Sequence, residues 1–283
     1  MLIKNQAVEI ANKISDQFIQ TSGDGLCGLA FDTINCVQPS PVKTPVDNMA
    51  LQSDIPPSSQ LFTAYLGSWK DANDPDQGQS FYTFGTIDQQ AVNGQTIMYA
   101  PVDSSRGFWQ FASTSTIING TSIALASNAA IADTGTTLAM IDDATCKAIY
   151  AAIPGSQYDS NQQGYVYPSS TAEADLPVVQ LAIGDHLVTI QKEFLGFQDS
   201  GNGMVYGSFQ SRGNLPFSIF GDAVLKNMYC IFDQVGVLCH VVKIILNADS
   251  CSLRATSSSV SCSAANRRRT WPPVRPLSRL RLW

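Results

Sequence analysis

The stretch IADTGTTLAMIDDA, residues 131–144, places one aspartate, Asp133, on a Thr-Gly turn between two apolar runs. Glycine lets the backbone turn tightly, and backbone N–H groups and threonine hydroxyls can hydrogen-bond a carboxylate in such a turn. A carboxylate fixed in this way can accept or release a proton at a defined position, which acid–base chemistry on a water molecule requires. Asp and Gly are also common in ordinary turns, so the surrounding sequence has to decide between a catalytic carboxylate and an ordinary turn residue.

The sequence around this turn indicates an all-β protein. Most of the chain consists of short runs rich in β-branched and aromatic residues, separated by Gly, Asn, Asp and Ser. One helix is predicted over residues 144–153, where Asp142 or Asp143 provides the N-cap and Pro154-Gly155 ends it. A shorter helix is predicted within Thr44–Ser53.

Charge divides the chain into an acidic body and a basic end. The whole chain of 283 residues carries −6 and is 44% hydrophobic, which is enough for a substantial core. Residues 249–283 hold seven arginines and one acid, a charge of +6, so residues 1–248 carry −12. An acidic body argues against nucleic-acid binding and suits a protein that works in acid, where protonation reduces the self-repulsion.

The two ends of the sequence differ from the rest. Residues 247–283 are rich in Ser, Arg and Pro, and we expect them to be disordered and to lie outside the fold. Polar and charged residues occur throughout the leading segment, which contains no apolar core of signal-peptide length. No later segment is long and apolar enough to span a membrane, so no membrane partner is predicted.

Several other kinds of site are disfavoured. Two histidines, His186 and His240, occur without an HExxH pattern, and no CxxC pair is present, so we predict no metal and no cofactor. No GxSxG occurs, which disfavours a serine hydrolase. Residues 23–28, GDGLCG, match GxGxxG, but they continue as strand and loop rather than opening a helix, which excludes a dinucleotide site.

The pairing of the cysteines stays open from the sequence. Cys27 could pair with Cys36, and Cys230 with Cys239, but we favour free buried thiols because cysteine is often buried without pairing.

Further motifs surround the Asp-Thr-Gly turn in a fixed order. They are DGLCGLAFDTIN at 24–35, GFWQF at 107–111 and FSIFGDAVLKNMYCIFD at 217–233. Together with the turn they resemble the pepsin-like aspartic endopeptidases, most closely the secreted fungal branch, from about Ile3 to Val242. The resemblance implies a bilobal all-β fold in which each lobe supplies one Asp-Thr-Gly and one apolar-apolar-Gly strand, with an extended peptide bound between the lobes.

Residue by residue, the resemblance places Asp133 on the catalytic aspartate of the second lobe. Thr134, Gly135 and Thr136 complete its turn, and Ile219-Phe220-Gly221 falls on the partner strand of the same lobe. Three regions are then expected along the chain. They are the trailing part of the first lobe at 1–84, an essentially complete second lobe at 85–246, and the tail at 247–283.

The resemblance also predicts a second carboxylate. Leu26-Cys27-Gly28 matches the apolar-apolar-Gly strand of the first lobe, but the Asp-Thr-Gly at 133–135 has no second copy in the sequence. The pepsin mechanism uses two carboxylates that share one proton and hold a water between them. We therefore expect an N-terminally truncated aspartic endopeptidase that is inactive by itself, with a catalytically inactive peptide- or protein-binding module as the alternative.

Partners and location follow from the same resemblance. The family implies a peptide or protein substrate and a secreted or vacuolar location, with the signal segment upstream of this sequence. Two copies that each donate Asp133 across a two-fold axis are not expected, because about half of a first lobe, in residues 1–84, would obstruct that interface.

Overall fold

The computed structural model describes residues 2–14, 23–67, 80–235, 240–244 and 279–282. It is built mostly of strands, so the predicted all-β class is confirmed. The helices are few and short. The α-helices are α2 (Pro45–Leu51), α3 (Gln89–Val92), α4 (Asp143–Ala151) and α5 (Asp222–Leu225), and the 3-10 turns are η1 (Asp32–Ile34), η2 (Pro57–Ser59), η3 (Glu173–Asp175) and η4 (Lys192–Leu195).

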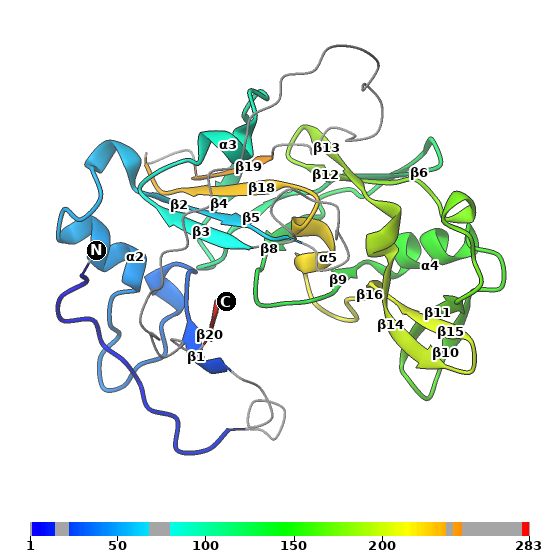
Figure 1. The fold of residues 1–283 in the computed structure, drawn as a ribbon, viewed down its shortest axis with the longest axis horizontal. Helices are drawn as coiled ribbons and strands as arrows, with labels where there is room; N and C mark the ends of the chain where they lie inside the picture. The colour runs from blue at the N-terminus through cyan, green and yellow to red at the C-terminus, as the bar shows by residue number, and fades with distance from the viewer. Residues whose placement is uncertain (1, 15–22, 68–79, 236–239, 245–278, 283) are drawn as a thin grey trace, which may run out of the picture.

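A ten-stranded sheet runs through the middle of the molecule (Figure 1). In spatial order its strands are β16 (Phe209–Ser211), β9 (Ala139–Ile141), β17 (Ser218–Phe220), β8 (Ala129–Ala132), β5 (Gln110–Ala112), β4 (Met98–Asp103), β19 (His240–Ile244), β18 (Tyr229–Asp233), β2 (Leu61–Tyr65) and β3 (Phe81–Phe84). Strands from the beginning, middle and end of the sequence alternate in it, so its order rests on long-range pairing.

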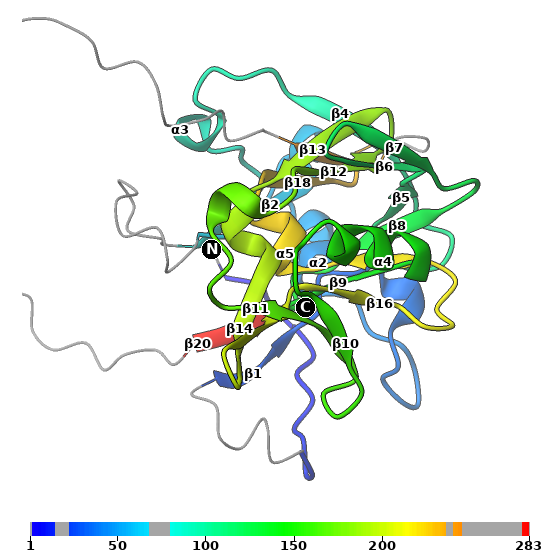
Figure 2. The same cartoon turned by 90° about the vertical axis from the view of Figure 1, so that its right-hand side faces the viewer.

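Two four-stranded sheets flank one end of the large sheet, with α4 between them (Figure 2). One has the order β10 (Gln157–Asp159), β11 (Gly164–Pro168), β15 (Met204–Gly207) and β14 (Gly196–Gly201). The other has the order β13 (His186–Ile190), β12 (Val179–Ile183), β6 (Ser115–Ile118) and β7 (Thr121–Ala124). A separate pair of strands, β1 (Gly23–Cys27) and β20 (Arg279–Leu282), lies at the opposite end (Figure 1).

Both predicted helices form, and α4 is capped by Asp142, one of the two N-caps predicted for it. Asp142 caps α4 by accepting a hydrogen bond from the Thr145 N–H at 2.9 Å. Thr44 caps α2 in a reciprocal capping box with Asp47, in which each side chain bonds the backbone N–H of the other residue. Such caps satisfy N–H groups that the first helical turn leaves unpaired.

Aromatic side chains join the leading part of the chain to the large sheet. The ring of Phe62 stacks on Phe232 with 4.6 Å between centroids, and Trp109 packs edge-on against both rings. The Trp109 indole N–H donates to the carbonyl oxygen of Leu29 at 2.9 Å. Burying three large rings with a satisfied indole favours one rigid unit here.

The predicted regions meet in continuous sheet structure. Strands β2 and β3 both precede residue 85. In the ten-stranded sheet β2 pairs with β18 on one side and with β3 on the other. In the tail, residues 245–278 lie outside the described residues, but β20 pairs with β1. The expectation for the rest of the tail stays a prediction, and within the tail the structure describes the one strand β20 at Arg279–Leu282.

The cysteines in the described part of the chain are free, as favoured from the sequence. Cys230 is fully buried, but Cys27 is only half-buried and Cys36 is exposed, so the prediction of burial is wrong for Cys36. Cys36 lies just after η1 in a surface loop, where no sheet covers it. Cys239 lies outside the described residues.

Candidate active site

Strand β8 carries Asp133 to the centre of the large sheet. The strand pairs antiparallel with β5 on one side and parallel with β17 on the other. Its residues are small or apolar, and Ala130 and Ile131 are buried. At its end the N–H of Ala132 donates to Trp109 O at 3.0 Å, and the N–H of Asp133 donates to Phe220 O at 3.1 Å. The backbone of Asp133 is therefore fixed by the neighbouring strand.

The Asp133 carboxylate accepts a hydrogen bond on each oxygen. The N–H of Gly135 donates to Oδ1 at 2.9 Å, and the Thr136 hydroxyl donates to Oδ2 at 2.6 Å. The N–H of Thr136 closes the turn on the Asp133 carbonyl at 3.3 Å. These contacts agree with the donors that the sequence predicts for an Asp-Thr-Gly turn, and they orient the carboxylate while leaving it half-buried.

Gly221 packs directly against this turn. A Cβ atom at Gly221 would lie 2.1 Å from Thr136 O and 2.4 Å from Leu138 O, so only glycine fits. The next two N–H groups, of Asp222 and Ala223, donate to the carbonyls of Thr136 and Thr137 at 2.8 and 3.1 Å. The predicted partnership between the strand at 219–221 and the Asp-Thr-Gly turn is thus present in the sheet.

Tyr82 on β3 contacts the same turn from another side. Burial raises the pKa of Tyr82 to about 12, although a hydrogen bond with the Thr134 side chain acts in the opposite direction. The phenol is therefore neutral at acid and neutral pH and available as a hydrogen-bond partner. The motifs did not identify Tyr82, because it reaches the turn only through the pairing of β2 with β18.

A pocket of about 360 Å³ opens beside Asp133 and Thr134. It is also lined by residues 28–31, which follow β1, and by five aromatic side chains: Phe31, Phe62, Phe108, Trp109 and Phe232. Among the described residues that line it, Asp133 alone has an ionisable side chain. The pocket thus combines one oriented carboxylate with mainly apolar walls.

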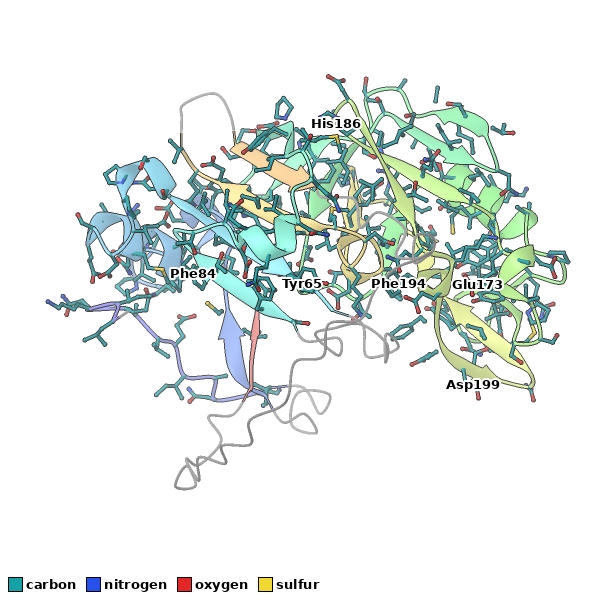
Figure 3. The ribbon with its side chains drawn as sticks, turned by 45° about the horizontal axis from the view of Figure 1, so that its top comes forward. Tyr65, Phe84, Glu173, His186, Phe194 and Asp199 are labelled. Carbon is teal, nitrogen blue, oxygen red and sulfur yellow. The ribbon has the colours of Figure 1, made fainter. Side chains whose placement is uncertain are left out.

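The sequence also contains a second tripeptide with the Asp-hydroxyl-Gly pattern, Asp199-Ser200-Gly201. Its local geometry is similar, since the Gly201 N–H donates to Asp199 Oδ1 at 2.8 Å. However, Asp199 is exposed on β14, far from Tyr65 and Phe84 of the large sheet (Figure 3). It does not line the pocket beside Asp133.

The other candidate residues do not gather around Asp133. His186 lies on β13, with Nε2 3.2 Å from Tyr99 O, and His240 lies on β19. In the ranges that the structure describes, no three His, Cys, Asp or Glu side chains are grouped so that they could hold a metal ion. No helix there has the length and apolar character needed to cross a membrane.

Comparison with known proteins gives the family of this chain. The family model for eukaryotic aspartyl proteases matches residues 1–239. Aspergillopepsin-1 of Aspergillus pseudoglaucus is 43% identical over 233 residues, which cover 82% of this chain and 55% of that protein. Penicillopepsin-1 of Talaromyces stipitatus is 40% identical over 230 residues, with 81% and 55% covered.

The chain spans about half the length of the curated relatives it matches. Its mostly β architecture with few helices fits the bilobal all-β fold that the sequence resemblance implies. The match over residues 1–239 and the identity of about 40% together show that this chain belongs to the eukaryotic aspartyl protease family.

Proposed function

We propose that Asp133 is one of the two catalytic carboxylates of a pepsin-like endopeptidase that hydrolyses peptide bonds at acid pH. The observation that carries this proposal is the fixed carboxylate. Its Oδ1 and Oδ2 are held by Gly135 and Thr136, and it lies beside a pocket with mainly apolar walls. The acidic charge of residues 1–248 supports work in an acidic compartment, reached by secretion or in the vacuole.

In this mechanism Asp133 shares one proton with the second catalytic carboxylate. Two neighbouring carboxylates titrate as a pair, so at acid pH one acts as base toward a water while the protonated one polarises the peptide carbonyl. Each oxygen of Asp133 accepts one hydrogen bond from its turn and retains a lone pair for the water or the shared proton. The Gly135 and Thr136 donors keep the group oriented through the cycle.

The second carboxylate is not among the described residues that line the pocket. We therefore propose that this chain supplies Asp133 alone and that the second aspartate comes from polypeptide outside these 283 residues. Without that partner, no single group can act as base and acid in the same step, so the 283-residue chain is expected to show no turnover.

The first experiment determines the coding sequence upstream of Met1 and expresses the longer product. We expect an upstream apolar-Asp-Thr-Gly segment, and hydrolysis of a denatured protein at acid pH that an active-site-directed aspartic protease inhibitor blocks. Asp133→Asn should reduce this activity to background, whereas Asp199→Asn, in the matched exposed tripeptide, should leave it unchanged. If Asp133→Asn cleaves the substrate as fast as the unchanged protein, Asp133 is not part of the mechanism.

A second function, binding of peptides without cleavage, is favoured by the five aromatic side chains that line the pocket. Of these, Phe31 and Phe108 are only partly buried, and accessible apolar side chains can bind an apolar partner. Here the 283-residue chain should retain a fluorescently labelled unfolded peptide, measured by anisotropy, and Asp133→Asn should bind it equally well. Inhibitor-sensitive cleavage by the 283-residue chain itself would rule out the non-catalytic function.

A further inference from the structure

Strands β1 and β20 form a parallel pair of their own. Gly23 lies opposite Arg279, Leu26 opposite Arg281, and Cys27 opposite Leu282, with an irregularity between Gly23 and Leu26. The two strands lie side by side in both ribbon views (Figures 1 and 2). Segments at opposite ends of the sequence are therefore paired, in a sheet separate from the three others.

The pair repeats an arrangement found beside the candidate site. There β17 pairs in parallel with β8, with Phe220 opposite Ala132. Strands β17 and β1 each end with the two apolar residues of an apolar-apolar-Gly sequence. It is Ile219-Phe220-Gly221 for β17 and Leu26-Cys27-Gly28 for β1. Strand β20 thus pairs with β1 in the same way as β8 pairs with β17.

The two pairs differ in what covers them. Strand β17 has a second neighbour in β9, and the Asp133 turn packs on Gly221. Strand β1 has β20 as its one partner within the described part of the chain, and no described atom lies within 4 Å of a Cβ built at Gly28. Since an isolated pair of strands is less stable than strands within a larger sheet, β20 is held less firmly than β8.

We propose that the β1 edge is a strand-acceptor site and that Arg279–Leu282 is its exchangeable occupant. An open strand edge presents unpaired N–H and C=O groups on which another chain can pair, and proteins block such edges with charged residues or covering segments. The occupant carries Arg279 and Arg281, and the body of the chain is acidic, so attraction of opposite charges favours docking within the molecule.

The β1–β20 pair also lies close to the candidate site. Gly28, the residue that follows β1, lines the same pocket as Asp133. Release of β20 therefore frees a strand edge that ends at the wall of the pocket. The proposed exchange of β20 does not depend on any catalytic activity of Asp133.

Amide hydrogen exchange tests the pairing in the full chain. We expect slow exchange over residues 23–27, and exchange at least about tenfold faster after Arg281→Pro or deletion of 279–283. Ala265→Pro, outside β20, should leave it slow. Residues 218–220 of β17 should remain protected in every variant, which shows that the fold is retained. Unchanged exchange over 23–27 in both variants would overturn the proposal.

A second arm tests whether the occupant exchanges. A synthetic peptide with the sequence of residues 279–283 is added to the deletion variant, and we expect it to restore slow exchange over 23–27. A peptide of the same composition in scrambled order is the control. If the scrambled peptide protects equally, or the native one does not protect at all, β1 is not a sequence-dependent strand acceptor.

Discussion

The apolar-apolar-Gly strands β17 and β1 have different environments. Phe220 on β17 is 1% exposed, and Gly221 is pressed against the Asp133 turn. On β1, Leu26 is 51% exposed and Gly28 is open to its surroundings among the described residues. Of these two strands, the one on which a turn packs is buried, so we infer that the covering segment decides what the pattern contributes to stability here.

The largest difference is expected when the central apolar residue of each strand is shortened. Phe220→Ala should lower the free energy of unfolding by about 3 to 5 kcal/mol, because it removes a fully buried ring that packs on Phe111. Cys27→Ala should lower it by less than about 1 kcal/mol. Urea unfolding followed by circular dichroism measures both, and similar losses would mean that β1 is buried as deeply as β17.

The glycines provide the next test. Gly221→Ala should cost about 2 to 3 kcal/mol or more, since the new Cβ would collide with backbone oxygens of Thr136 and Leu138 that cannot move aside easily. Gly28→Ala should stay within about 0.5 kcal/mol of the wild type. The same unfolding assay decides, and a large loss for Gly28→Ala would reveal a covering segment on β1.

A smaller effect is expected from the turn itself. Thr136→Val keeps the shape of the side chain but removes the hydroxyl that donates to Asp133 Oδ2, and should cost about 1 kcal/mol because the carboxylate is only half-buried. Thr137→Val, at the exposed neighbouring position, is the control. If both variants unfold at the same urea concentration, the hydroxyl does not contribute to holding the turn.

The smallest change is a difference in thiol reactivity, which leaves the fold intact. Burial raises the pKa of both Cys27 and Cys230, so little thiolate of either exists near neutral pH. Half-buried Cys27 should react with iodoacetamide faster as the pH rises above about 8, whereas fully buried Cys230 should react only after unfolding. Peptide mapping by mass spectrometry follows each site, and early labelling of Cys230 would contradict its burial.

Local features of the sequence predicted local structure well. The cap at Asp142 and the donors around Asp133 depend on residues within a few positions of each other, and the structure has them as expected. Their physical basis is short-range hydrogen bonding, which a short stretch of sequence specifies.

Features that depend on distant pairing could not be predicted in this way. Asp199-Ser200-Gly201 makes nearly the same local hydrogen bond as the Asp133 turn, but its strand leads to an exposed edge and not to the sheet centre. Tyr82 reaches Thr134, and β20 reaches β1, through contacts between remote segments. Only the order of strands distinguishes these cases.

The ten-stranded sheet also has a consequence for the order in which the molecule is completed. The hydroxyls of Thr63 and Tyr229 are 2.9 Å apart, although 166 positions separate the two residues. Strand β2 can pair early with β3, but its other edge has to wait until β18 has left the ribosome. Because closing so long a loop is slow, β2 is among the last strands of this sheet to gain both of its neighbours.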